Sequence, residues 1–135
     1  MSNWLSKSKI SLSIANNDSL LFNNRVHCFY YGCLQYMLHI LHSHFKMPVE
    51  QIAQDSNPNY NGGKGSHLWL RNKVVNDLRN KTYRFDSLDR NNYLGDLKRL
   101  RIYADYGHDD IDIESLWLAK DLSSKIQTIL TKRYQ

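Results

Sequence analysis

Apolar residues recur every three to four positions along most of the chain, which is the spacing of one face of an α-helix. The clearest stretch runs from Leu20 to Phe45, and its length of about 26 residues corresponds to a helix of roughly 39 Å. Asp18 or Ser19 is suited to cap its start, and Pro48 prevents it from continuing. We expect this helix to be the spine of the fold, with these apolar residues on its buried face: Val26, Phe29, Tyr30, Cys33, Leu34, Met37, Leu41 and Phe45.

Two shorter helical segments flank this spine. The spacing of apolar residues predicts a helix over residues 4–15 and a short turn of helix over residues 49–54. The run from Asp55 to Gly65 holds three of the six glycines and one of the two prolines. Glycine and proline at this density are typical of a surface loop, so we expect the chain to cross between helices here.

Three further helices are predicted in the C-terminal half of the chain. The first is capped by Ser66, the second opens at Ser87 or Asp89, and the last starts at Asp112. Gly107 is expected to end the second of them by a left-handed stop. No alternation of polar and apolar residues competes with the helical spacing, so the sequence predicts an all-α, up-and-down bundle of four to five helices.

Composition limits the class of protein. The 135 residues carry 18 Lys and Arg against 13 Asp and Glu, a formal charge of +5, and an apolar fraction of 41% is typical of a globular chain. One domain over residues 1–135 has enough length to bury a core. No stretch is apolar enough to predict a membrane span or a secretory signal. Cys28 and Cys33 indicate reduced, buried thiols, so a cytoplasmic protein is expected.

The basic residues are concentrated in one part of the chain. Between Lys64 and Arg101 there are ten basic residues and four aspartates, a net charge of +6, whereas the segments on either side are nearly neutral or acidic. Such a basic belt is a candidate surface for nucleic acid or another anion, and the alternative is a solvated helical face. The nucleic-acid-binding candidates within it are Arg71, Lys73, Lys98, Arg99 and Arg101.

Other patterns that invite a ligand have simpler explanations. His39 and His42 lie one helical turn apart but have no acidic or cysteine partner at ligand spacing, so no metal site and no cofactor are predicted. The run from Gly62 to Ser66 lacks both the spacing of a phosphate-binding loop and a preceding strand, which favours a flexible connection. An aromatic stripe is more typical of core contact than of a platform for bases: Phe29, Tyr30, Tyr31 and Tyr36.

The C-terminal end of the basic belt carries residues suited to chemistry. On a helix Arg101 and Asp105 are one turn apart and can pair, while Arg101 and His108 are two turns apart on the same face. An arginine and a histidine that converge suit metal-independent cleavage of RNA, with the histidine as general acid or base and the arginine holding the phosphate. Gly107 is expected to break the helix before His108. The alternative is a structural Arg–Asp pair, with Tyr106 packed at the helix end.

Three segments, in this order, carry a resemblance to a known family. They are Asn24-Arg-Val-His-Cys-Phe-Tyr-Tyr-Gly32 on the long helix, Ser66-His67 at the start of a later one, and Arg101-Ile-Tyr-Ala-Asp-Tyr106. With the closing helix they resemble the HEPN family (higher eukaryotes and prokaryotes nucleotide-binding) from about Ser19 to Leu130. The resemblance implies an up-and-down helical bundle that is commonly a homodimer. It also implies a place beside a small nucleotidyltransferase, or in toxin–antitoxin and phage-defence loci.

The resemblance also assigns residues. Ribonuclease members of the family carry an arginine followed four to six residues later by a histidine, with the two copies meeting at the dimer interface. Arg101 matches that arginine, His108 stands at the longest spacing, and Tyr106 occupies the tighter register. The Ala-Asp-Tyr version resembles the branch of the family in which ribonuclease activity is not assured. A structural or pocket role is expected for Asp105, His67, His27 and Tyr31.

Three functions follow as hypotheses. The leading one is a HEPN-type homodimer that binds a nucleotide, an RNA or a nucleotidyltransferase partner, with no membrane association. The second is a metal-independent endoribonuclease whose active pair is Arg101 and His108, with Tyr106 as a further candidate. The third is a non-catalytic adaptor that docks another protein through an apolar aromatic face. Phosphate contacts weaken steeply as salt rises, whereas apolar docking does not, so salt dependence separates the first from the third.

Overall fold

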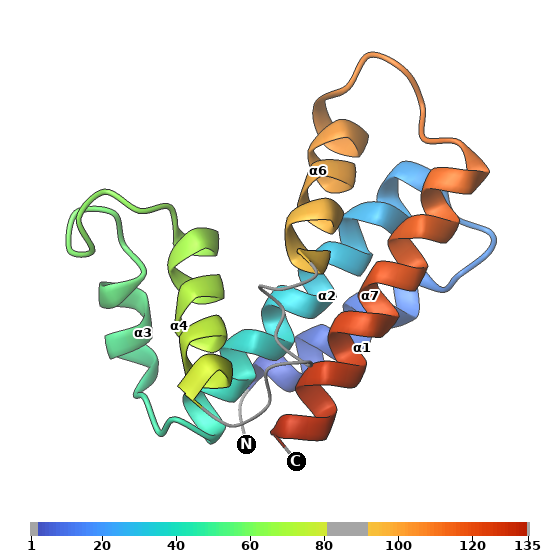
Figure 1. Ribbon diagram of the computed structural model, residues 1–135. Helices are drawn as coiled ribbons and strands as arrows, with labels where there is room; N and C mark the ends of the chain where they lie inside the picture. Colours follow the sequence, from blue (N-terminus) through green and yellow to red (C-terminus); the bar gives the residue numbers. More distant parts are fainter. Residues whose placement is uncertain (1–2, 81–91, 135) are drawn as a thin grey trace.

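The computed structural model describes residues 3–80 and 92–134, which form helices and no strand (Figure 1). The all-α prediction is confirmed. The described residues contain six helices rather than four or five, because the short segment after Pro48 is a helix of its own. None of the helices in these two ranges is long and apolar enough to cross a membrane. The helices are α1 (Asn3–Ala15), α2 (Phe22–Ser43), α3 (Val49–Asp55), α4 (Ser66–Asn80), α6 (Tyr93–Tyr106) and α7 (Ile113–Arg133).

Helix α2 is the centre of the fold, as its apolar spacing predicts. It packs against α1, α6 and α7 and, through its C-terminal half, against α3 and α4. In Figure 1 the α3–α4 hairpin therefore lies to one side of α2 and the α6–α7 pair to the other. Ten of its 22 residues are buried, so the apolar stripe supplies the surface on which every other helix is assembled.

The ends of α2 differ from the prediction. The helix starts two residues later and stops two residues earlier than expected, which makes it about 33 Å long. The predicted cap at Asp18 or Ser19 is wrong: Leu21 occupies the N-cap position and makes no side-chain hydrogen bond there. Both polar residues have other partners. The carboxylate of Asp18 accepts from Arg25 at 3.2 Å, and the amide and hydroxyl of Ser19 donate to Asn17.

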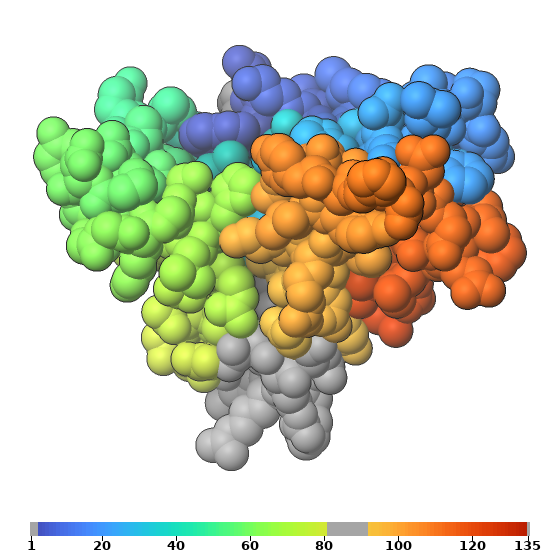
Figure 2. All heavy atoms as spheres, turned by 90° about the horizontal axis from the view of Figure 1, so that it is seen from above, coloured from blue at the N-terminus to red at the C-terminus, as the bar shows by residue number. Residues whose placement is uncertain are grey.

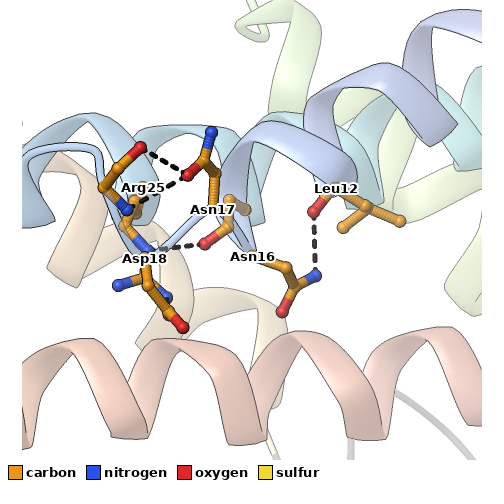
Figure 3. Close-up of polar contacts among 7 residues, drawn as sticks. Leu12, Asn16, Asn17, Asp18 and Arg25 are labelled. Atoms are coloured by element: carbon orange, nitrogen blue, oxygen red, sulfur yellow. Dashed lines mark hydrogen bonds and ion pairs between the residues drawn. The ribbon is translucent and has the colours of Figure 1, made fainter.

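The α1–α2 seam is closely packed and fully hydrogen-bonded at its centre. The hydroxyl of Ser8 donates to the carbonyl oxygen of Gly32 over 2.7 Å, and a Cβ atom at Gly32 would lie 2.7 Å from the Leu12 side chain. Where α1 ends, Arg25 Nε–H donates to the carbonyl oxygen of Ala15 over 2.8 Å, next to the polar turn drawn in Figure 3. A basic side chain on the last carbonyls of a helix is a favourable C-terminal partner. The buried Arg25 therefore closes this connection.

The C-terminal helices begin and end by different means. Asp112 caps α7 as predicted, and its carboxylate accepts from the amide of Ser115 over 2.7 Å. The predicted left-handed stop at Gly107 is wrong, because this residue is extended (φ −70°, ψ 157°) and its amide still donates to the Tyr103 carbonyl. Glycine fits there for a different reason, since a Cβ atom would lie 2.5 Å from that oxygen. The start predicted at Ser87 or Asp89 lies outside the described residues.

The core forms one continuous cluster around α2. Cys33 is buried in it as a free thiol, and burial raises its pKa to about 12, which matches the predicted inert thiol. Cys28 is also free but only half-buried, so the prediction is right for one cysteine and too strong for the other. In the aromatic stripe Phe29 and Tyr30 are core residues, whereas Tyr31 and Tyr36 remain partly exposed.

Candidate anion-binding site at Arg101

Side chains from three helices meet around one buried arginine. Arg101 and Asp105 come from α6, and His67 comes from the first turn of α4. Figure 2 shows α4 and α6 side by side on one face of the molecule, with a little of α2 visible between them. We call this group of residues the Arg101 site: Arg101, Asp105, His67 and, from α2, His27, Tyr30 and Tyr31.

The guanidinium of Arg101 lies against two tyrosine rings. Its Cζ atom is 5.1 Å from the ring centroid of Tyr30 and 5.6 Å from that of Tyr31. Aromatic faces attract cations at this range, and the attraction grows when the pair is desolvated. Arg101 is only 8% exposed, so the two rings hold a guanidinium that is largely desolvated.

One nitrogen of this guanidinium has no hydrogen-bond partner among the described residues. Its Nε atom is buried, and no acceptor among the described residues lies within hydrogen-bond distance of it. Nη1 of Arg101 is 3.6 Å from Oδ2 of Asp105, so the predicted pair is confirmed as an ion pair but is too long for a hydrogen bond. A buried charged donor without an acceptor is costly to the folded state. An anion that reached the Nη groups of Arg101 would add an acceptor where the contact to Asp105 is long.

Asp105 is shared between Arg101 and a histidine. The Nδ1 atom of His27 lies 2.9 and 3.1 Å from the two carboxylate oxygens of Asp105. The His27 imidazole also stacks on Tyr31, with ring centroids 4.5 Å apart and planes 31° apart. Because its partner is an acceptor, Nδ1 of His27 is the donor in this contact, and the ring is held in one orientation.

His67 is held neutral on the other side of the site. Burial, followed by the charges of Arg101 and Lys98, keeps the pKa of His67 below its usual value. Burial raises the pKa of Tyr30 to about 12 even though Arg101 opposes this, so its hydroxyl is protonated near pH 7. The Tyr30 hydroxyl lies 3.1 Å from Nδ1 of His67. A neutral imidazole has one donor and one acceptor nitrogen, so Nε2 of His67 offers the role that Nδ1 does not use.

The structure divides the five predicted nucleic-acid-binding residues. Lys98 shares a face of α6 with Arg101 and is close enough to lower the pKa of His67, while Arg71 follows His67 by one turn on α4. Lys73 lies on another face of α4, 5.8 Å from the ring of Trp69. Arg99 also lies apart from Arg101, since it pairs with Asp96 and lines a hollow against α7. Three further basic residues of the belt lie outside the described ranges: Lys81, Arg84 and Arg90.

Two of the three predicted catalytic residues lie away from this cluster. His108 has a fully exposed side chain and lies 3.2 Å from Asp109, because the chain leaves α6 in extended conformation at Gly107. Tyr106 is 79% exposed. Within the chain the imidazoles beside Arg101 are instead those of His27 and His67. The resemblance marked both histidines, but nothing in the sequence separates Tyr30 from an ordinary core residue.

The other sequence patterns offer no competing site. Within residues 3–80 and 92–134, no three His, Cys, Asp or Glu side chains group as metal ligands. His42 contacts the Met47 carbonyl oxygen through Nδ1, and His39 contacts the hydroxyl of Ser43. Comparison of the chain with family models, with curated proteins and with solved structures gives no match. The interpretation of the site therefore rests on its geometry and charge.

Proposed function

We propose that this protein binds RNA or a nucleotide by holding a phosphate at Arg101. The observation that carries the proposal is the buried Arg101 guanidinium, whose Nε has no acceptor among the described residues and whose nearest ion-pair contact is 3.6 Å long. Phosphate oxygens supply strong acceptors in the geometry that a guanidinium fork matches. A bound phosphate would add acceptors at the Nη groups, whose contact to Asp105 is too long for a hydrogen bond.

The neighbouring charges support the same ligand. Lys98 and Arg71 add positive charge on the faces of α6 and α4 that carry Arg101 and His67. Tyr31 and His27 present stacked, partly exposed rings beside the guanidinium, and such rings are suited to contact bases or sugars. Asp105 is the one acidic residue of the Arg101 site, and its carboxylate accepts a hydrogen bond from His27.

The resemblance to the HEPN family extends the proposal. It would make the chain a homodimer and a component of a toxin–antitoxin or defence locus, acting beside a small nucleotidyltransferase. Arg101 would then be the family arginine used to hold a ligand, whether or not the chain cleaves it. Analytical ultracentrifugation of the pure protein tests the dimer directly, and a single monomeric species at all concentrations would remove that part of the proposal.

Binding of a labelled single-stranded RNA tests the phosphate site. We expect Arg101→Gln to weaken binding at least tenfold, and binding by the native protein to fall steeply between about 50 and 200 mM salt. Arg99→Gln is the matched control, because it removes the same charge from the same helix at a residue that pairs with Asp96. If the two variants bind RNA equally well, the phosphate is not held at Arg101.

A second candidate function is metal-independent RNA cleavage. The observation that favours it is the His27–Asp105 contact beside Arg101, since a carboxylate that orients an imidazole is a common arrangement for a general base. Incubation with labelled RNA in EDTA, with Arg101→Ala/His108→Ala and His27→Gln beside the native protein, tests it. Loss of cleavage in the double variant alone favours His108, and loss in His27→Gln favours His27. Absence of cleavage by the native protein rejects the enzyme.

The adaptor hypothesis is tested by the same salt series. Exposed apolar side chains on α6 and α7 favour a protein partner, and they include Tyr103, Tyr106 and Trp117. Binding of a partner to these side chains would change little between low and moderate salt. A partner whose binding resists salt and survives Arg101→Gln would show that the apolar face, rather than the Arg101 site, carries the interaction.

A further inference from the structure

An apolar cleft of about 370 Å³ lies next to the Arg101 site and has no part in the phosphate contact described above. Four helices line it, and most of the lining side chains are aliphatic or aromatic, including Trp4 from α1, Leu34 and Leu38 from α2, and Trp69 from α4. Its volume falls at the small end of the range for small-molecule pockets, about 300–1,000 Å³. The cleft therefore has room for one ring system rather than for a long ligand.

The cleft and the Arg101 site share a wall. Tyr31 and His67 line the cleft, and both belong to the Arg101 site. Their ring centroids are 5.7 Å apart, and the Tyr31 ring is 5.6 Å from Cζ of Arg101. The guanidinium is thus one side chain away from the cleft. A ligand with a flat apolar part and a neighbouring anionic group would reach both.

The polar groups at the wall suit a base better than an alkyl chain. Nδ1 of His67 contacts the Tyr30 hydroxyl, which leaves Nε2 to form a hydrogen bond with a ring nitrogen or an exocyclic group of a base. Ser66, at the start of α4, adds a hydroxyl to the lining. Aromatic side chains stack on every base because each base has a flat π face. An alkyl chain would leave these polar groups without partners.

We propose that the apolar cleft binds the base of a nucleotide, free or within RNA, whose phosphate is held at Arg101. The inference rests on the proposed function, because Arg101 is the phosphate ligand in both. It adds a base subsite with aromatic walls from α1, α2 and α4. It also assigns His67 as the residue that lies between the base subsite and the phosphate site.

Tryptophan fluorescence reads the cleft directly. Two of the three tryptophans, Trp4 and Trp69, line it, whereas Trp117 is 62% exposed on α7. A Trp117→Phe background therefore leaves only the two reporters in the cleft. We expect at least one of the four ribonucleoside 5′-monophosphates to quench this fluorescence, and its nucleoside to bind at least tenfold more weakly. Quenching by decanoate but by none of the four nucleotides would overturn the proposal.

Ala53→Phe tests the base subsite and Arg101→Gln tests the phosphate site, so the two proposals can fail separately. Ala53→Phe fills the cleft from an exposed position on α3, and Ser124→Phe adds the same ring on α7 as a control. We expect Ala53→Phe to abolish nucleoside binding, Ser124→Phe to leave it unchanged, and Arg101→Gln to reduce the affinity for the nucleotide to that for the nucleoside. If Ala53→Phe leaves nucleotide binding intact, the base subsite is wrong and the phosphate site stands. If Arg101→Gln leaves it intact, the phosphate site itself is wrong.

Discussion

Two buried arginines organise two regions of this molecule in opposite ways. In the α1–α2 seam, Arg25 donates from Nε to the carbonyl oxygen of Ala15. It also pairs with Asp18 at 3.2 Å, and both residues lie at the turn drawn in Figure 3. In the Arg101 site, Arg101 is equally withdrawn from water, yet its Nε has no acceptor among the described residues. Arg25 has hydrogen-bond partners at two of its nitrogens, whereas Arg101 has an unpaired Nε and a long ion pair with Asp105.

The difference separates a structural role from a functional one. A guanidinium that completes the end of a helix contributes to stability through each hydrogen bond it makes. A guanidinium that lies against two tyrosine rings with its Nε unpaired contributes less, because a buried donor without an acceptor is costly. Arg25 and Arg101 are buried to a similar extent. They differ at Nε, which has an acceptor in Arg25 and none among the described residues in Arg101.

The largest expected effect on stability is at the seam. Arg25→Met keeps an apolar stem of similar length but removes the donor to Ala15, so the free energy of unfolding should fall by about 2 kcal/mol. Urea denaturation followed by circular dichroism measures it. RNA binding by the folded variant should match that of the native protein. A variant that is as stable as the native protein would show that the seam does not depend on this contact.

A smaller loss is expected from closing the gap between α1 and α2. A Cβ atom at Gly32 would lie 2.7 Å from Leu12, so Gly32→Ala forces the two helices or the leucine to move. Overpacking of this kind costs about 1–3 kcal/mol, while alanine recovers up to about 1 kcal/mol of helix propensity, which leaves a net loss near 1 kcal/mol. Ser13→Ala is the control, because this exposed position on α1 gains helix propensity without a close contact. Equal thermal midpoints for the two variants would contradict the close approach.

The smallest effect concerns the pH dependence of stability. The pKa of His67 is lowered in the folded protein, so below its ordinary pKa of about 6.5 the unfolded chain binds more protons than the folded one. The free energy of unfolding therefore falls as the pH is lowered from about 6.5. His67→Gln should flatten this decrease, and urea midpoints between about pH 7 and 5 measure it. His39, whose pKa is lowered in the same direction, is present in both proteins and cancels. Parallel pH profiles would mean that His67 is not held neutral.

Local features of the fold were predictable and long-range ones were not. The Asp112 cap and the Arg101–Asp105 pair depend on residues three and four positions apart, so helical geometry was sufficient. The cap expected at Asp18 failed because the helix begins at Phe22, with Leu21 at the N-cap position, so Asp18 lies outside its first turn. Apolar spacing does not specify the residue at which a helix begins.

The Arg101 site shows the same limit more sharply. Tyr30 and His67 are brought to Arg101 by the packing of α4 and α6 on α2, and no spacing along the chain encodes that meeting. His108 seemed closer to Arg101 because a continued helix would place it two turns later on the same face. The extended backbone at Gly107 directs it to solvent instead. The sequence identifies residues that could bind or react with a ligand. Which of them lie together depends on how the helices pack.

The stability of Arg101→Met with and without RNA is the most direct test of the central claim that Arg101 is kept for a ligand. Without RNA we expect the variant to be at least as stable as the native protein, because an apolar side chain replaces a buried charge whose Nε is unpaired and whose ion pair with Asp105 is long. RNA at about 100 times its dissociation constant should stabilise the native protein by about 2.7 kcal/mol and the variant far less. A variant that loses about 2 kcal/mol without RNA, as expected for Arg25→Met, and gains as much from RNA as the native protein would contradict it.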